Sequence, residues 1–243
     1  QKDLVGANEE LDVLKTLDWA KFYRLYHRAQ IASFTGDNAG AEATFAELFK
    51  SDPRIMSIAT NYARFRAAGG DNAGAKAIID QHIAAGSSHP LAVALALSLK
   101  KGEPQTIAAA TANAGLADVF YGLGEALASE GGIDVGTIYL QLSLFLDPDQ
   151  PLALAALASV QEQTKQYERA IATYDRIPST SPISFQTTLR KAQNLNALDK
   201  VDEAKAALDA LLAAPVTSAV DDLGDEPALD TSASRACASG TRS

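Results

Sequence analysis

Hydrophobic positions along this chain recur at spacings of three and four residues. Residues 151–164 and 167–177 show the pattern clearly, and Gly, Pro and polar turn residues separate such segments. This spacing places apolar side chains on one face of an α-helix, whereas a half-buried strand alternates apolar and polar residues. No stretch alternates over a strand's length between turn signals. The pattern therefore predicts an all-α fold.

A small residue recurs at a nearly fixed interval, in what we expect to be the second helix of successive helix pairs. The steps between these residues are 34, 34, 34, 27, 34 and 34, for Ala7, Ala41, Ala75, Ala109, Gly136, Ala170 and Ala204. Four residues after each small residue lie Leu11, Phe45, Ile79, Asn113, Leu140, Tyr174 and Leu208. All of these are apolar or aromatic except Asn113. Antiparallel helices approach closely only where facing residues are small, and a large residue one turn later fills the adjoining space.

Glycine and proline mark the ends of these helices. Five residues before the small position lie Gly36, Gly70 and Gly131, and twelve residues after it lie Pro53, Pro148 and Pro182. Glycine permits a tight turn between helices, and proline ends one helix and favours the first turn of the next. The sequence GDNAGA occurs at 36–41 and again at 70–75. It lacks the acidic spacing of a calcium loop, so we interpret its Asp and Asn residues as helix caps.

This spacing resembles the tetratricopeptide repeat (TPR) family, whose 34-residue helix–turn–helix unit has a small residue, an aromatic and a proline in these positions. The resemblance covers roughly residues 1–215 and implies a right-handed α-solenoid of antiparallel helix pairs. The alternative is a generic helical bundle with coincidental spacing. The expected units are a half-repeat at 1–18 and repeats at about 22–55, 56–89, 90–116, 117–150, 151–184 and 185–215. The repeat at 90–116 is degenerate, and we expect a clipped first helix or a kinked junction there.

The two ends of the chain differ from the repeats. Residues 1–18 provide only a second helix, which indicates either truncation of a longer protein or a solvating cap helix. Residues 216–243 are small, polar and acidic, and are expected to form a flexible tail. The sole Trp19 lies in a linker and not in the family's usual position. Residues 144–182 also resemble part of large alphaproteobacterial TPR proteins of unassigned role, which implies a bacterial protein.

The net charge and the cysteine content limit which partners and which cellular compartments are expected. The 243 residues include 21 Lys and Arg against 30 Asp and Glu, a formal net charge of −9. An acidic surface repels phosphate backbones and anionic lipid, so nucleic acid and membrane surfaces are not expected partners. No apolar run approaches the roughly 18 residues that a membrane span needs. The only cysteine, Cys237, cannot form an intrachain disulfide, which is compatible with the cytoplasm and with the periplasm.

No motif for catalysis, a metal or a cofactor is found. His27, His82 and His89 lack the spacing of a helical zinc site, and we expect partly exposed residues instead. The sequence GLGEAL at 122–127 lacks the strand and the Lys-Ser/Thr of a phosphate loop, so Gly124 is interpreted as a small helix-contact residue. Cys237 has no neighbouring base. We therefore predict that the protein is not an enzyme.

The TPR resemblance suggests which residues face a ligand, because first helices line the concave surface of such solenoids. The corresponding positions here carry Tyr23, Tyr26, Gln30, Asn61, Arg64, Tyr121, Glu125, Glu162, Gln193 and Asn196. Tyrosine, arginine and amide side chains suit an extended peptide. Only Asn61 matches the Lys and Asn pattern with which some family members clamp a carboxylate, so that clamp is not expected.

The sequence thus favours a non-catalytic scaffold that binds a protein or peptide in its concave groove. The rival hypothesis is a structural module whose groove or edge packs on its own chain or on a second copy, through the N-terminal half-repeat. An enzyme with an appended repeat domain would need its catalytic part elsewhere.

Overall fold

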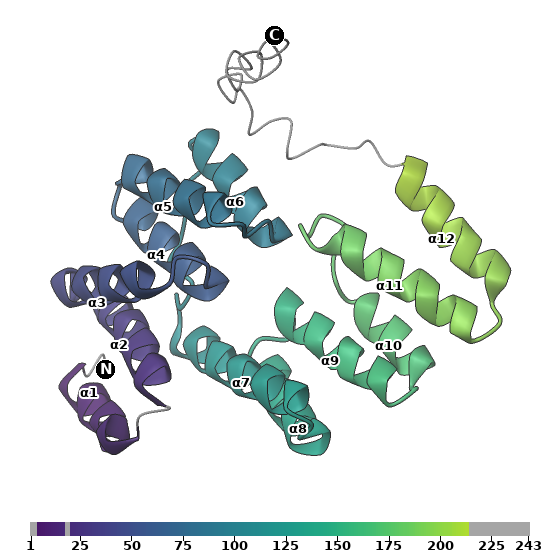
Figure 1. Ribbon diagram of the computed structural model, residues 1–243, viewed down its shortest axis with the longest axis horizontal. Coiled ribbons are helices and arrows are strands. Elements are labelled where there is room, and N and C mark those ends of the chain that lie inside the picture. Colours follow the sequence, from purple (N-terminus) through teal and green to yellow (C-terminus); the bar gives the residue numbers. More distant parts are fainter. Residues whose placement is uncertain (1–3, 18–19, 214–243) are drawn as a thin grey trace, which may run out of the picture.

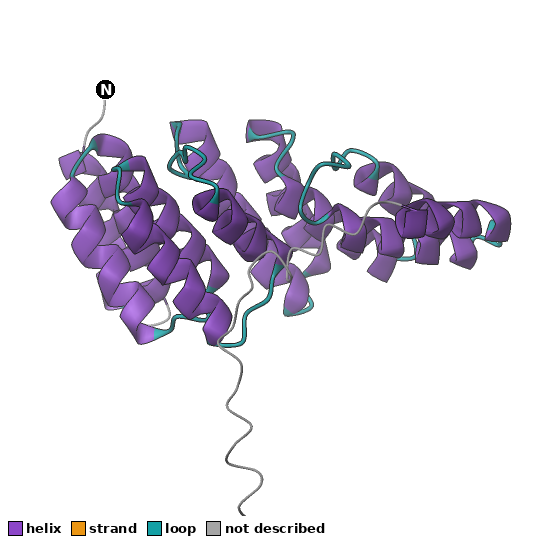
Figure 2. Ribbon diagram, turned by 90° about the horizontal axis from the view of Figure 1, so that it is seen from above, coloured by secondary structure: helices purple, strands orange, loops and turns teal. Residues whose placement is uncertain are grey.

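The computed structural model describes residues 4–17 and 20–213, and within these ranges it contains helices and no strand (Figure 2). The expected tail at 216–243 and Trp19 lie outside the described residues. Apart from a 3₁₀ turn at Val13–Thr16, the elements are α1 Leu4–Asp12, α2 Lys21–Thr35, α3 Asn38–Ser51, α4 Met56–Ala68, α5 Asn72–Ala84, α6 Pro90–Lys100, α7 Ala112–Ser129, α8 Ile133–Leu146, α9 Pro151–Gln163, α10 Tyr167–Tyr174, α11 Ser184–Ala197 and α12 Val201–Ala213.

Consecutive helices pack as pairs along a curved row, in the order of the sequence (Figure 1). The pairs are α2 with α3, α4 with α5, α7 with α8, α9 with α10, and α11 with α12, while α1 packs on α2 as a single preceding helix. This is an all-α solenoid of the TPR type. Most contacts join neighbouring helices, so the fold is built from local interactions between adjoining pairs.

Most of the small and large residues of the repeat pattern lie in the core. Ala41, Ala75 and Ala170 are completely buried, as are the large residues Ile79 and Leu140 four positions after a small residue. The core is continuous from α2 to α6, and a second apolar cluster extends from the end of α7 to Ile183. The sequence interpretation of these positions as helix contacts is thus confirmed in α3, α5, α8 and α10. It is wrong for Leu208, which is exposed, and for Ala109, which lies in a turn, while Ala7 and Leu11 are only half-buried.

Replacing Ala170 with leucine should lower the free energy of unfolding by about 1–3 kcal/mol, because the added methylenes overpack a closed helix crossing. Ala172→Leu is the matched control, since Ala172 lies on the same helix α10 but is exposed. Thermal unfolding of both variants checks the prediction. An equal effect of the two substitutions would show that Ala170 is not at a crossing.

The two copies of GDNAGA cap helices, as expected. The side chain of Asp37 accepts a hydrogen bond from the backbone N–H of Gly40 at 3.1 Å, and Asp71 accepts one from Gly74 at 2.8 Å. Each aspartate satisfies an N–H that has no partner within its helix. Gly36 precedes the first cap with a φ of +91°, a left-handed conformation that glycine adopts without strain.

The degenerate repeat at 90–116 differs from the expectation. Its first helix, α6, is intact, whereas its second helix is absent and Ala109 lies in a turn. Gly102 ends α6 with a φ of +71°, and Pro104 then has no backbone N–H to donate. The loop is held instead by side chains, since Ser98 donates to Glu103 and accepts from Gln105, each at 2.6 Å. Thr111 then caps α7, which begins five residues before the expected boundary at 117.

His82 is also a correction, because it is fully buried and not partly exposed. Its Nδ1 lies 2.7 Å from the carbonyl oxygen of Pro53, which identifies Nδ1 as the protonated nitrogen that donates to this oxygen. The hydrogen bond links α5 to the loop before α4. The imidazole thus joins two neighbouring repeats instead of facing solvent.

Candidate functional site

A cavity of about 660 Å³ lies between the first helices of successive pairs. Its walls come from α2, α4, α7 and the segment that joins α8 to α9, with α6 contributing Leu91. We call this cavity the groove. Seven of the ten residues that the sequence placed on a ligand-facing surface line it, namely Tyr23, Tyr26, Gln30, Asn61, Arg64, Tyr121 and Glu125.

A hydrogen-bonded clasp joins α2 to α7 across one side of the groove. The Tyr26 hydroxyl donates to Asp118 Oδ2 at 3.0 Å, and Gln30 Nε2 donates to the same oxygen at 2.9 Å. Asn61 on α4 donates to the Tyr26 hydroxyl. Tyr26 and Gln30 are each only 6% exposed, and their polar groups are already used within the chain.

The clasp changes the titration of two rings. Burial raises the pKa of Tyr26 well above its usual value, and the negative charge of Asp118 adds to this effect. Burial also lowers the pKa of His27, which lies beside Tyr26 with ring centroids 5.2 Å apart, although Asp118 opposes that shift. Tyr26 therefore stays protonated as a donor, and His27 tends to be neutral.

Arg64 is the arginine in the lining of the groove, and it has no partner among the described residues. Its guanidinium forms no ion pair or hydrogen bond with any described residue, and desolvation lowers its pKa. A partly buried cation without a counter-charge costs free energy, because it has lost water without gaining hydrogen bonds. Such a group suits a ligand that brings carbonyl or carboxylate oxygens.

The opposite wall of the groove is acidic. Glu125 on α7 is exposed, and Asp147 and Asp149 follow α8; none of these carboxylates pairs with a described residue. Burial raises the pKa of Tyr121, and the carboxylates of Glu125 and Asp118 raise it further. The groove thus has a cationic wall at Arg64 and an anionic wall along α7.

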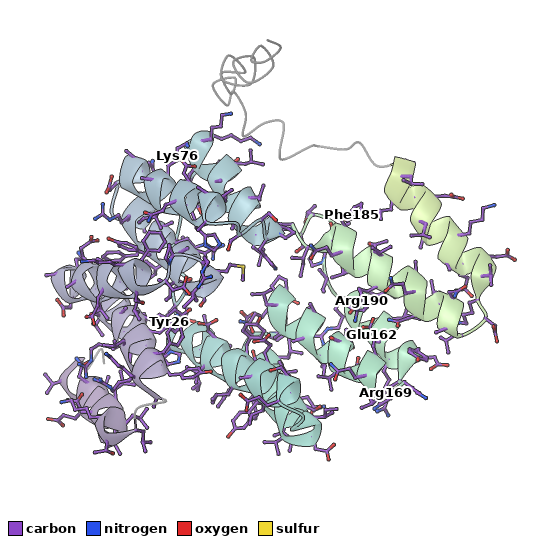
Figure 3. All side chains as sticks on the ribbon, viewed as in Figure 1. Tyr26, Lys76, Glu162, Arg169, Phe185 and Arg190 are labelled. Carbon is purple, nitrogen blue, oxygen red and sulfur yellow. The ribbon has the colours of Figure 1, made fainter. Side chains whose placement is uncertain are left out.

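The other three predicted residues lie outside the groove. Glu162 on α9 accepts hydrogen bonds from Arg190 and from Asn194 Nδ2, the latter at 2.7 Å, so it connects the first helices of two neighbouring pairs (Figure 3). Gln193 and Asn196 are exposed on α11 and do not reach the cavity. The structure therefore divides the ten residues into a group of seven around the groove and a group of three beyond it.

Asp118, Arg190 and Asn194 take part in these contacts but were not singled out from the sequence. Asp118 had a signal that could have identified it, since it is an isolated acidic residue in the apolar run LADVFYGLG. A charge in such a run is retained where it has partners. Its partners on α2 lie about ninety positions earlier, and no local pattern indicates them.

The described residues contain no cluster of three or more His, Cys, Asp or Glu side chains that could hold a metal ion. None of the described helices is both long and apolar enough to cross a membrane. The groove offers hydrogen-bonding and ionic groups, without a nucleophile aligned to a base in its lining.

No protein-family model and no curated protein matches the chain. It is similar to the solved structure of MamA, with 16% identity over 79% of this chain and 91% of that one, and a TM-score of 0.39. YrrB, described as a TPR protein with an unusual peptide-binding site, has 13% identity over 92% and 98%, with a TM-score of 0.39. PilW, a widely conserved type IV pilus biogenesis factor, has 20% identity over 91% of both chains, with a TM-score of 0.34.

The chain thus resembles TPR proteins in its helix pairs and its 34-residue spacing. At these identities and TM-scores, the similar structures carry no argument about its function or ligand.

Proposed function

We propose that this protein is a non-catalytic scaffold that binds an extended polypeptide in the groove. The observation that carries the proposal is Arg64, a desolvated guanidinium without a partner among the described residues, in the wall of a cavity of about 660 Å³. An extended polypeptide offers carbonyl oxygens along its length, and Arg64 can donate to them.

The surrounding residues support a peptide as the ligand. Tyr23 projects from α2 with its hydroxyl unpaired among the described residues, and its ring meets that of Phe22 edge-on at 5.7 Å. Rigid aromatic side chains and arginine contribute most to binding in many protein interfaces. The acidic wall and the net charge of −9 favour a basic or neutral segment over an acidic one.

A second candidate function has its own observation. The bonds from Tyr26 and Gln30 to Asp118 join α2 to α7, so these polar groups of the groove are already used within the chain. In addition, α1 exposes Val5, and Val13 follows it with 71% of its surface exposed. This favours an assembly module whose N-terminal helix packs on a second copy. A concentration-dependent dimer that Val5→Ser with Val13→Ser abolishes would support this function.

The test of the scaffold function starts with the full chain as bait and mass spectrometry of the bound proteins. Replacing Tyr23 and Arg64 by alanine should then weaken binding of the identified partner by roughly 2 kcal/mol or more, a factor of about 30. We choose Tyr23 over Tyr26 because Tyr26 takes part in the clasp, and its loss would also affect folding.

The matched control replaces Tyr167 and Arg169 by alanine on the second helix α10; neither residue lines the groove. This pair removes the same residue types, and the affinity should stay within about twofold. Isothermal titration calorimetry measures both affinities, and circular dichroism checks helicity. An unchanged affinity of the groove variant would exclude the groove as the binding site.

A further inference from the structure

Helix α8 has an exposed apolar face on the side opposite its packed face. Val135, Ile138, Leu142 and Phe145 are 50%, 56%, 40% and 82% exposed. Their spacing of three, four and three residues puts them within roughly 80° of one another around the helix axis. The packed face is formed by Gly136, Leu140, Ser143 and Leu144, which are buried against the rest of the chain.

This face is unusual for an exposed helix. A helix with apolar residues all round is normally buried on all sides, whereas a surface helix has a polar outer face. The outer face of α8 instead carries four large apolar side chains. Helix α8 lies at the margin of the molecule and packs against α7 on its inner side (Figure 1). Contiguous exposed apolar residues commonly mark a site of interaction with another macromolecule.

The charge around this face indicates the chemistry of its partner. Residues 102–164, which include all of α7, α8 and α9, contain eight Asp or Glu and no Lys, Arg or His. Asp134 lies one turn before Ile138 at the edge of the face, and Glu130 lies at the end of α7. Both carboxylates are exposed, and neither pairs with a described residue. The apolar face thus lies in a region whose ionisable groups are all acidic.

We propose that the outer face of α8, formed by Val135, Ile138, Leu142 and Phe145, is a docking surface for a basic amphipathic helix of another protein. The partner's apolar stripe covers the four side chains, with Phe145, the most exposed of them, as the main anchor. Its lysines and arginines meet Asp134 and Glu130 at the rim, where they steer association and set its salt dependence. This surface is separate from the groove, so the two sites can hold different segments.

The test uses a fluorescein-labelled peptide of roughly 18 residues, long enough to form a helix, with leucine at helical spacing and lysine elsewhere. Fluorescence anisotropy with the full chain should show saturable binding that weakens as salt is added. A peptide with glutamate in place of lysine should bind at least about tenfold more weakly. Equal binding of the two peptides would overturn the proposal.

The variant that tests the surface is Ile138→Ala with Phe145→Ala, which should weaken binding of the lysine peptide by about tenfold or more. The matched control is Val201→Ala with Leu212→Ala on α12, whose side chains are 58% and 80% exposed. The control should bind like the original protein, as should the Tyr23→Ala, Arg64→Ala groove variant. A loss of affinity in either of these as large as that in the α8 variant, or no loss in the α8 variant, would overturn the proposal.

Two further measurements distinguish the proposed helix from two other occupants of this face, a second copy of the chain and a membrane. Sedimentation velocity that shows a dimer lost in the α8 variant would assign the face to a second copy of this chain and overturn the proposal. Flotation with phosphatidylcholine–phosphatidylglycerol vesicles that depends on Phe145 would assign it to a membrane, with the same consequence. A monomer that does not float with vesicles, together with loss of peptide binding in the α8 variant, would support the docking surface.

Discussion

Replacing Gly136 with leucine is expected to lower the free energy of unfolding by about 3 kcal/mol or more. A methyl group at Gly136 would lie 2.7 Å from the carbonyl oxygen of Gly124 and 2.8 Å from the backbone nitrogen of Ala128. Both obstacles are backbone atoms of α7, which cannot rotate away as a side chain can. The helices must therefore separate, and α7 and α8 would lose the close contact that joins them.

Thermal and denaturant unfolding measure this effect, and a drop in melting temperature of roughly 6 °C or more is expected for a chain of this length. Gly122→Ala provides the matched control, since a methyl group at Gly122 on α7 meets nothing within 4 Å. This substitution should stabilise the protein by about 0.5–1 kcal/mol, because alanine favours a helix interior more than glycine does. A Gly136→Leu variant as stable as the original protein would contradict the close crossing.

Replacing Asp118 with alanine should lower the free energy of unfolding by about 2–3 kcal/mol. The change removes the acceptor shared by Tyr26 and Gln30, which are almost fully buried and then have no partner in that position. Unpaired buried donors cost more than the net value of the hydrogen bonds themselves. The loss should also loosen the contact between α2 and α7 across the groove.

A control variant and a double-mutant cycle test whether the lost hydrogen bonds cause the loss of stability in Asp118→Ala. Glu130→Ala removes an exposed carboxylate that pairs with no described residue, and should change stability by less than about 0.5 kcal/mol. Tyr26→Phe removes only the hydroxyl. The loss of unfolding free energy that it causes should largely vanish when Asp118 is already alanine, which corresponds to a coupling energy of about 1 kcal/mol or more. Additive effects in denaturant unfolding would mean that the hydrogen bond between these residues does not contribute.

Helix caps and contact positions could be predicted from the sequence, because they depend on residues only a few positions apart. The caps at Asp37 and Asp71 follow from a side chain and a backbone N–H three residues apart. The small residue at Ala170 and the aromatic at Tyr174 follow from the 3.6-residue turn, and both are buried. The same reasoning missed the absent second helix after α6, because apolar small residues such as those at 107–110 are compatible with a helix or a loop.

The sequence predicted only some of the residues that line the groove. Family positions pointed to Tyr23, Asn61 and Arg64, which do line it. The same positions also gave Gln193 and Asn196, which lie elsewhere, because the position of a residue within its repeat says nothing about how far the solenoid has curved. Curvature is set by the packing between repeats, and the missing helix after α6 changes that packing midway along the chain.

The sequence by itself determined that this protein is a row of helix pairs, because helix periodicity, capping and small contact residues all act over short distances. Only the tertiary structure decided that Asp118 meets Tyr26 and Gln30, that Arg64 has no partner among the described residues, and that α8 exposes an apolar face. These features depend on which side chains meet across separate repeats, and on which faces no other helix covers. Such contacts arise between residues that are distant in the chain, so no local pattern encodes them.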